Sequence, residues 1–316
     1  MNLTEFVNKI VSEIKHHLPA EYADATVTIQ ECPKPGNQFL TGIVIRRPGE
    51  MLVPVVYLDE FYQDYSNGHI NFPDIYAELT NILCHQNKIT VDTKRFLDWN
   101  VAKEYIISHL INIANGQNTA YIAERPYTMM DNSNLAIIYD LDFSDDENIR
   151  TIPVSYDLMK GWNVSLEDIS NAANQNNPRL RPVRIEAIDS VIADLIPGIE
   201  VSPHQGLAMY VITNTRRTYG AITVIYDGVD KLLRDFLGDY YLIPSSVHEM
   251  IAVSRKNFDI ETLCTMIQDV NQTEMRPCDI LEDVPYIIAN KQLQFADTEK
   301  SKQRSIPDCG SIPILV

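Results

Sequence analysis

The sequence predicts an α+β protein of two lobes, each with a mostly antiparallel sheet packed by short helices. The chain has 316 residues, and a single hydrophobic core rarely grows beyond about 250–300 residues, so we expect two domains. Period-two β patterns follow one another in hairpin-like groups, and amphipathic helical patterns lie between these groups. Because strands and helices do not alternate strictly, the pattern favours α+β over a doubly wound fold.

The first lobe opens with an amphipathic helix at residues 3–18, whose apolar residues recur at the helical spacing of three and four. Asn2 and Glu5 have the spacing of a capping box at its start, and Pro19 ends it. The next segments are rich in β-branched residues and predict a meander. Its strands are expected at residues 25–31, 40–46 and 52–58.

Three helical patterns complete the first lobe. They lie at residues 59–65, at 73–86, and from Asp98 through Ile111. A polar stretch from Gly116 to Asp131 then interrupts the pattern, so we place the domain boundary there. The predicted parts are an N-terminal domain at residues 1–125, a C-terminal domain at 126–296 and a flexible tail at 297–316.

The second lobe starts with a predicted hairpin, whose strands at residues 135–143 and 149–154 flank an acidic turn. Ser155 and Ser165 are predicted to cap two helices, the second with Asp168 at its third position. Further strands are predicted at residues 207–213, 221–225, 240–244, 250–253, 286–289 and 292–295, and further helices at 188–196, 229–237 and 259–270.

The net charge of −17 limits the classes of partner. Binding to nucleic acid or to anionic membranes depends on Lys and Arg, so we expect neither. No apolar run approaches the roughly 20 residues that span a bilayer, and the N-terminus has no basic and then apolar leader, so we expect a cytoplasmic protein.

Most of the excess acidity follows residue 130. Such acidity is typical of a soluble surface. It also suits a basic protein partner, or mimicry of nucleic acid, which needs dense rows of carboxylates. The acidic residues that cluster are Asp142, Asp145, Asp146 and Glu147.

The sequence carries none of the common cofactor and metal signatures. It has no Gly-rich phosphate loop, no Gly-x-Ser-x-Gly elbow and no His-Glu-x-x-His motif. Its five cysteines include no Cys-x-x-Cys pair, and in a reducing cytosol they are expected to be thiols. We therefore expect no cofactor and no metal site.

The candidate catalytic site is a polar segment after a predicted strand, which contains Ser245, Ser246, His248 and Glu249. Hydroxyl, imidazole and carboxylate are the groups of a nucleophile, its base and an orienting residue, provided that the loop brings them together. In an extended segment, Ser246 and His248 share a face while Glu249 lies opposite. The alternative is a polar connection between strands, in which the serine hydroxyls bond the local backbone.

The candidate binding site is a polar loop that contains Asn214, Arg216 and Arg217. Guanidinium groups bind carboxylate or phosphate, and the alternative is an exposed turn with a basic tip. Asp140 and Asp142 share one face of a predicted strand. Paired carboxylates can act as acid and base, or they can belong to the solvated face of a hairpin.

The segment from Tyr241 to Met250, which reads Pro-Ser-Ser-Val-His-Glu at its centre, resembles a bacterial domain-of-unknown-function family, number 5688, seen mainly in anaerobic Gram-positive bacteria. The likeness extends over almost the whole chain except the tail. Stretches that share it include residues 27–31, 40–45, 135–139, 162–168 and 213–221. The resemblance implies a stand-alone cytosolic protein, and it carries over no catalytic residue, cofactor or substrate.

The lack of a catalytic template and the strong acidity together favour a non-enzymatic binding or adaptor protein. A small hydrolase or ligand-binding enzyme built on the Ser245–Glu249 loop is one alternative, and a nucleic-acid mimic is another. The fold does not decide among them, because function resides in particular sites rather than in a fold.

Overall fold

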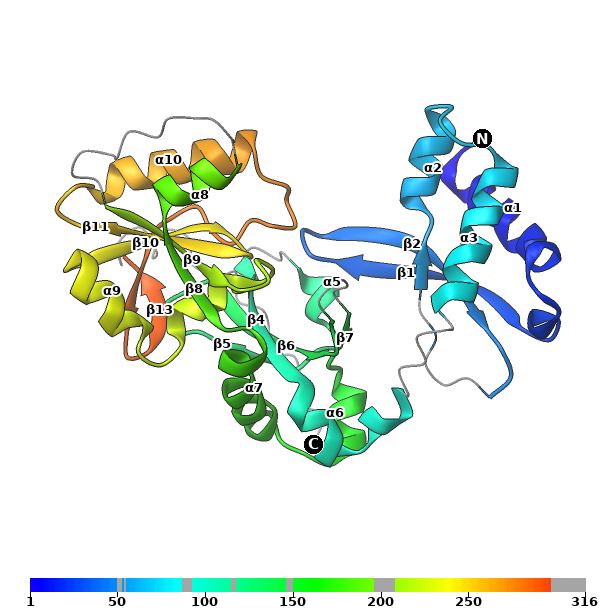
Figure 1. Ribbon diagram of the computed structural model, residues 1–316, viewed down its shortest axis with the longest axis horizontal. Helices are drawn as coiled ribbons and strands as arrows, with labels where there is room; N and C mark the ends of the chain where they lie inside the picture. Colours follow the sequence, from blue (N-terminus) through cyan, green and yellow to red (C-terminus); the bar gives the residue numbers. More distant parts are fainter. Residues whose placement is uncertain are drawn as a thin grey trace. The chain divides into compact units, whose positions relative to one another are not determined.

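The computed structural model describes residues 1–49, 53, 55–86, 93–114, 118–145, 150–195 and 208–296. Two compact units make up the chain (Figure 1). The first consists of Met1–Lys34 and Gln38–Val101, and the second of Pro35–Asn37 and the chain from Ala102 onward. The predicted tail at residues 297–316 lies outside the described residues.

The first unit contains a three-stranded antiparallel sheet and helices. Its strands, in spatial order, are β1 (Thr26–Lys34), β2 (Gln38–Arg46) and β3 (Val55–Tyr57). Its α-helices are α1 (Leu3–Glu13), α2 (Asp59–Ser66) and α3 (Phe72–Gln86), and its 3₁₀ helices are η1 (Ile14–His17), η2 (Ala20–Tyr22) and η3 (Thr93–Leu97). The predicted capping box of the first helix is confirmed, because Asn2 and Glu5 each accept the other's backbone N–H.

The core of the first unit forms between the apolar faces of its helices and its sheet. Phe6 and Ile10 of α1, Ile75 and Leu79 of α3, and Ile43 of β2 are all fully buried in one cluster. Burial of each such side chain stabilises the fold by roughly 1.5–3 kcal/mol. The apolar residues whose helical spacing predicted α1 and α3 are therefore the residues that pack these helices into the core.

The second unit contains two antiparallel sheets. In the four-stranded sheet, β4 (Ile106–Asn112), β6 (Leu135–Asp142) and β5 (Tyr127–Met129) lie in that order, and β7 (Thr151–Pro153) also pairs with β6. The six-stranded sheet has the order β13 (Gln292–Phe295), β12 (Tyr286–Ala289), β10 (Tyr240–Ser246), β11 (Glu249–Ser254), β9 (Met209–Asn214) and β8 (Val183–Ala187). The prediction of an α+β protein with antiparallel sheets is confirmed.

Helices surround these sheets, and α8 and α10 cover one face of the six-stranded sheet in Figure 1. The helices after Val101 are α5 (Thr119–Ile122), α6 (Tyr156–Trp162), α7 (Leu166–Leu180), α8 (Ile188–Leu195), η6 (Gly220–Ile225), α9 (Val229–Leu237) and α10 (Ile260–Thr273), and α4 (Trp99–Ala102) with η4 (Lys103–Tyr105) precedes them. Ser155 and Ser165 cap α6 and α7 as predicted, since their hydroxyls accept backbone N–H groups three residues on.

The helix α7 is fastened to the outer edge of β4 by two buried asparagines. The Asn177 side chain accepts the backbone N–H of Ser108 at 3.0 Å and donates to the Ser108 hydroxyl at 2.9 Å. The Asn176 amide donates to the Ile106 carbonyl at 2.9 Å. These backbone groups have no strand partner on that side, so the helix supplies the hydrogen bonds that buried peptide groups need.

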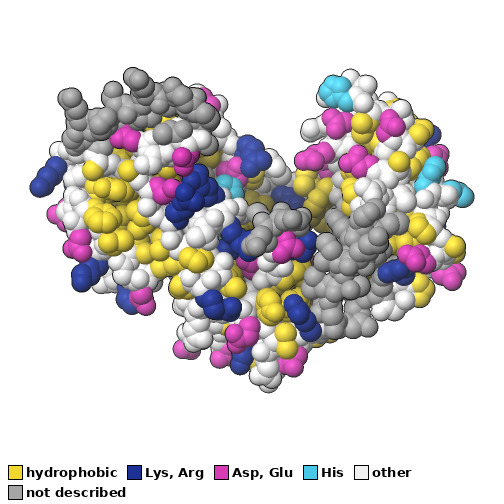
Figure 2. Space-filling model, in the orientation of Figure 1, with side chains coloured by type: hydrophobic (Ala, Val, Ile, Leu, Met, Phe, Trp, Pro, Cys, Tyr) yellow, Lys and Arg dark blue, Asp and Glu magenta, His cyan; other side chains and the backbone are white. Residues whose placement is uncertain are grey.

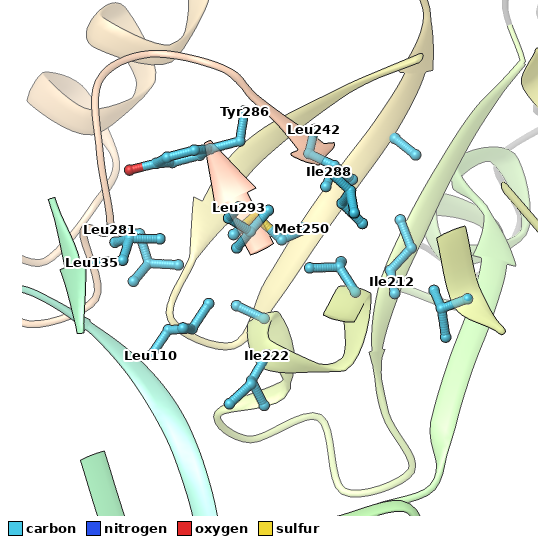
Figure 3. Close-up of a cluster of buried hydrophobic side chains, with 14 of the residues drawn as sticks. Leu110, Leu135, Ile212, Ile222, Leu242, Met250, Leu281, Tyr286, Ile288 and Leu293 are labelled. Carbon is cyan, nitrogen blue, oxygen red and sulfur yellow. The ribbon is translucent and has the colours of Figure 1, made fainter. Parts of the chain in front are cut away.

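The two sheets of the second unit share one hydrophobic core (Figure 3). Leu110 and Leu135 come from the four-stranded sheet, and Leu242 and Met250 from the six-stranded sheet. Ile222 joins them from η6. Because residues from both sheets fill one cluster, the four-stranded sheet cannot be separated from the six-stranded one without opening the core.

One predicted element is wrong in kind and another is wrong in part. The helix expected from Asp98 through Ile111 is helical only in α4 and η4, and from Ile106 onward it is the strand β4, all of whose seven residues are buried. The apolar pairs Ile106–Ile107 and Leu110–Ile111 are four residues apart, which is also the spacing of a helix, so periodicity does not distinguish this buried strand from a helix. The strand expected at residues 221–225 is the 3₁₀ helix η6, because β9 already has β8 and β11 on its two sides and offers no edge to a returning strand.

The division between the units lies earlier in the chain than the predicted boundary between residues 125 and 126. Ile106 to Asn112 pair along their whole length with Leu135 to Asp142, so a boundary at residue 125 would separate paired strands. The polar stretch that suggested the boundary is the connection between β4 and β6, and Gly116 within it lies outside the described residues.

Candidate functional site

The Ser245–Glu249 segment contains the tight turn between β10 and β11: Ser245 and Ser246 end β10, and Glu249 begins β11. The strand register shifts just before it, between Ile243 and Ser246. The Ser245 hydroxyl donates to Glu249 Oε1 at 3.2 Å. Ser246 is buried, and its hydroxyl accepts the backbone N–H of His248 at 3.0 Å. Both hydroxyls are thus engaged within the turn, as in other polar turns whose serine side chains bond the nearby backbone.

The His248 ring lies between two partners, and neither is a serine. Its Nδ1 accepts the backbone N–H of Tyr219 at 3.1 Å, so the neutral ring carries its proton on Nε2. Nε2 faces Asp279 Oδ1 at 3.4 Å. The carbonyl of His248 in turn accepts the N–H of Gly220 at 2.9 Å and the Thr213 hydroxyl at 2.8 Å. His248 therefore holds the loop that follows β9.

That loop, Asn214–Gly220, contains the predicted binding residues, and the buried Asn214 side chain shapes it. The Asn214 amide donates to the Thr218 carbonyl at 2.8 Å, and its Oδ1 accepts the Arg216 N–H at 2.9 Å. Gly220 closes the loop in van der Waals contact with the backbone of Asn214 and His248. Asn214 thus serves the loop's conformation, and its side chain is not presented to solvent.

The two loop arginines already have partners nearby. Arg217 donates to Glu186 Oε2 at 3.1 Å, and Arg184 donates to the other oxygen of the same carboxylate at 2.5 Å. Arg216 donates to the backbone carbonyl of Asp145 at 2.5 Å. The predicted catalytic and binding segments, which are about 30 residues apart in sequence, thus lie side by side and share the contact between His248 and Tyr219.

A second group of polar residues lies buried beside this loop. His109 of β4, Asp140 of β6 and Arg125 are each 3–4% exposed. Arg125 Nη2 donates to Asp140 Oδ1 at 2.5 Å and to the Tyr139 carbonyl at 2.8 Å. His109 Nδ1 lies 3.3 Å from Asp140 Oδ2 without the alignment of a hydrogen bond. The Tyr219 ring stacks on the His109 ring, with centroids 4.3 Å apart.

Asp142, two residues further along the same face of β6, belongs to an equivalent pair. Its Oδ2 accepts the Nε–H of Arg181 at 2.7 Å, and both side chains are buried. Burial alone would raise the pKa of Asp142, but the Arg181 contact and the N–H of Ser144 outweigh it and lower the pKa. Neither Asp140 nor Asp142 faces solvent, so the solvated-hairpin interpretation of this pair is wrong.

The sequence indicates only part of this cluster, because Asp140 and Asp142 stand out as a pair on one strand while no local signal points to their cationic partners. Arg125 and Arg181 are distant from them in sequence and lie outside the pattern of β6. His109 falls in a segment predicted as a helix, where its neighbours could not be inferred. The four buried charges neutralise one another, as buried charges must to avoid a large desolvation cost.

The contact between His109 and Asp140 joins a neutral imidazole to a carboxylate. Burial, opposed by the charge of Asp140 and assisted by those of Arg125 and Arg181, lowers the pKa of His109 to about 4. A buried histidine is therefore held without a proton at neutral pH.

We expect the stability of the protein to fall between pH 6.5 and pH 4 through His109. In that window the unfolded chain binds the imidazole proton and the folded chain does not, which costs about 3 kcal/mol by pH 4. Urea denaturation at several pH values measures this, with His109→Gln as comparison because that variant cannot take up the proton. Parallel pH profiles for wild type and His109→Gln would contradict the expectation.

The described part of the chain contains neither a candidate metal site nor a candidate membrane-spanning helix. No group of three or more His, Cys, Asp or Glu side chains there is placed to hold a metal ion. None of the described helices combines the length and the apolar character needed to cross a membrane. The described cysteines Cys32, Cys264 and Cys278 are thiols.

Comparison with known proteins gives one match. The model of a family described as a family of unknown function, DUF5688, matches residues 3–289. No curated protein and no solved structure matches the chain significantly.

Proposed function

Since the chain belongs to the DUF5688 family of unknown function, we propose from its own residues that it is a non-enzymatic binding or adaptor protein. The observation that supports this most is the engagement of both ring nitrogens of His248, by Tyr219 and by Asp279. A serine nucleophile needs a base within hydrogen-bond reach. The only imidazole in the turn is committed to the neighbouring loop.

The alternative, a small hydrolase, has one contact in its favour. Ser245 donates to Glu249, so a carboxylate could take the place of the histidine as base. The two groups lie next to each other at the end of a strand pair. In the described part of the chain, no third side chain is hydrogen-bonded to Glu249 to orient it. Ser246, being buried, is poorly placed to meet a substrate.

The net charge of −17 suits a partner with a basic face. The arrangement of the acidic side chains does not suit a nucleic-acid mimic. Asp142 is buried against Arg181, so it does not resemble an exposed phosphate. The exposed Asp145 pairs with Arg150 at 2.7 Å, which offsets its charge. Their neighbours Asp146 and Glu147 lie outside the described residues. On the face of the second unit seen in Figure 2, acidic side chains are interspersed with Lys and Arg rather than aligned in a row.

Two measurements test the proposal. A fluorophosphonate probe is expected to leave the purified protein unlabelled, and labelling that Ser245→Ala or Ser246→Ala abolishes would overturn it. In parallel, full-length protein serves as bait in native lysate at low salt, and each captured protein is purified and titrated directly. Its affinity is expected to fall as salt screens the charges. Captured partners whose binding is insensitive to salt would contradict a basic partner.

A further inference from the structure

The cluster around His109 contains a concentration of buried hydrogen-bond donors without partners. In the part of the chain that the structure describes, five buried side-chain nitrogen or oxygen atoms have none. Four of the five belong to this cluster: Arg125 Nε and Nη1, Arg181 Nη2 and His109 Nδ1. Buried polar atoms are almost always satisfied in native proteins, so the gathering of four in one place needs an explanation.

The residues that carry these atoms all contact or lie near the Asp140–Asp142 face of β6. Asp140 contacts both Arg125 and His109, and Asp142, on the same face of β6, contacts Arg181. Both arginines are close enough to His109 to disfavour its protonated form. The unpartnered nitrogens therefore belong to side chains beside the Asp140–Asp142 face of β6.

The chemistry of the region calls for a ligand that accepts several hydrogen bonds. Each arginine carries five N–H donors, and Asp140 and Asp142 each meet one guanidinium group, so unused donors remain on both arginines. Because the two carboxylates balance the two guanidinium charges, the unused donors rather than a net charge select the ligand. An oxyanion accepts several N–H bonds at once, and guanidinium is the group that binds carboxylate and phosphate in two-pronged geometry.

We propose that Arg125, Arg181 and His109 form a binding site for a small oxyanion, of the carboxylate or phosphate class. The two guanidinium groups bind the anion, and His109 donates from Nδ1. Tyr219 forms the outer wall, since it is half-buried and stacks on His109. Arg216 and Arg217 lie on the same loop as Tyr219.

This site goes beyond the proposed binding to a protein partner and does not depend on it. It gives the loop Asn214–Gly220 a second role, because the loop that His248 fixes also places Tyr219 over the cluster. Several hydrogen bonds fix this loop, and a fixed loop loses less conformational freedom when a ligand binds.

The experiment uses the full chain with inorganic phosphate and with acetate, each against chloride at equal ionic strength. We expect one of the two anions to raise the melting temperature saturably and to shift the Nε–H signals of two arginines in ¹⁵N spectra. A response to phosphate alone assigns the phosphate class, and a response to acetate alone assigns the carboxylate class. No response beyond that of chloride would show that water satisfies the donors and would overturn the proposal.

Matched variants locate the effect. Arg125→Lys and Arg181→Lys keep the charge but lose the two-pronged donor, so each is expected to weaken anion binding at least roughly tenfold. Arg276→Lys is the control, because the Arg276 side chain is 75% exposed and lies on Asp279 rather than in the cluster. Wild-type affinity in both cluster variants would refute the site. The outcome leaves the test for a protein partner unaffected.

Discussion

Replacing Arg125 with methionine is expected to lower the free energy of unfolding by about 3–5 kcal/mol. Asp140, 3% exposed, would keep its charge in the interior with only a neutral imidazole beside it. The Tyr139 carbonyl would lose a donor as well. The cost comes mainly from the stranded carboxylate, because the loss of one partner from a buried pair exposes the full desolvation cost of the other.

Urea denaturation measures the loss, and two further variants make the result specific. Arg125→Met combined with Asp140→Leu removes both charges and should recover most of the stability, since an apolar replacement of a buried pair is often neutral. Arg234→Met breaks a half-exposed pair with Asp230 and should cost less than about 1 kcal/mol. If Arg125→Met costs no more than Arg234→Met, the cluster is not the buried ion pair described above.

Gly220→Ala is expected to destabilise the second unit by about 3 kcal/mol, at the upper end of the usual cost of overpacking. A Cβ at this position would lie 2.6 Å from the His248 carbonyl oxygen and 2.7 Å from the Asn214 backbone nitrogen, and it would also meet the Thr213 hydroxyl. Two of these three neighbours are backbone atoms held by hydrogen bonds, so they cannot move aside without breaking the link between the loop and the turn.

Gly161→Ala provides the matched control, because a Cβ there has nothing within 4 Å. Gly161 lies inside α6, where alanine is favoured over glycine by up to about 1 kcal/mol. The two substitutions are therefore expected to shift the urea midpoint in opposite directions. A midpoint for Gly220→Ala at or above that of wild type would show that the loop and the turn are not in close contact.

Local signals predicted most of the elements. Ser165 and Asp168 form the expected capping box, and the apolar stripe of residues 3–18 became α1 with the 3₁₀ turn after it. These signals work because capping and amphipathic burial involve residues a few positions apart. The strands β5 and β8 were not predicted, since Tyr127–Met129 and Val183–Ala187 are short and depend on distant partners for pairing.

The sequence predicts which types of residue lie at the site, but it does not predict the contacts between them. His248 and Arg217 were recognised as polar residues in loops, yet nothing local indicates that the His248 ring bonds the residue before Gly220. Asp140 and Asp142 were expected in a hairpin, and the exposure expected for them failed because Arg125 and Arg181 arrive from other elements. Ion pairs between residues that are distant in the sequence leave no periodic pattern, so they cannot be recognised from the sequence.

The asparagines of α7 also protect an edge strand from pairing with another copy of the chain. A strand at the edge of a sheet is a template on which another chain can add a strand, and β4 is such an edge. Asn176 and Asn177 occupy the hydrogen-bonding groups that an incoming strand would use. Aggregation through this edge therefore requires α7 to detach first, so the helix acts as a guard against edge-to-edge assembly as well as a fastening.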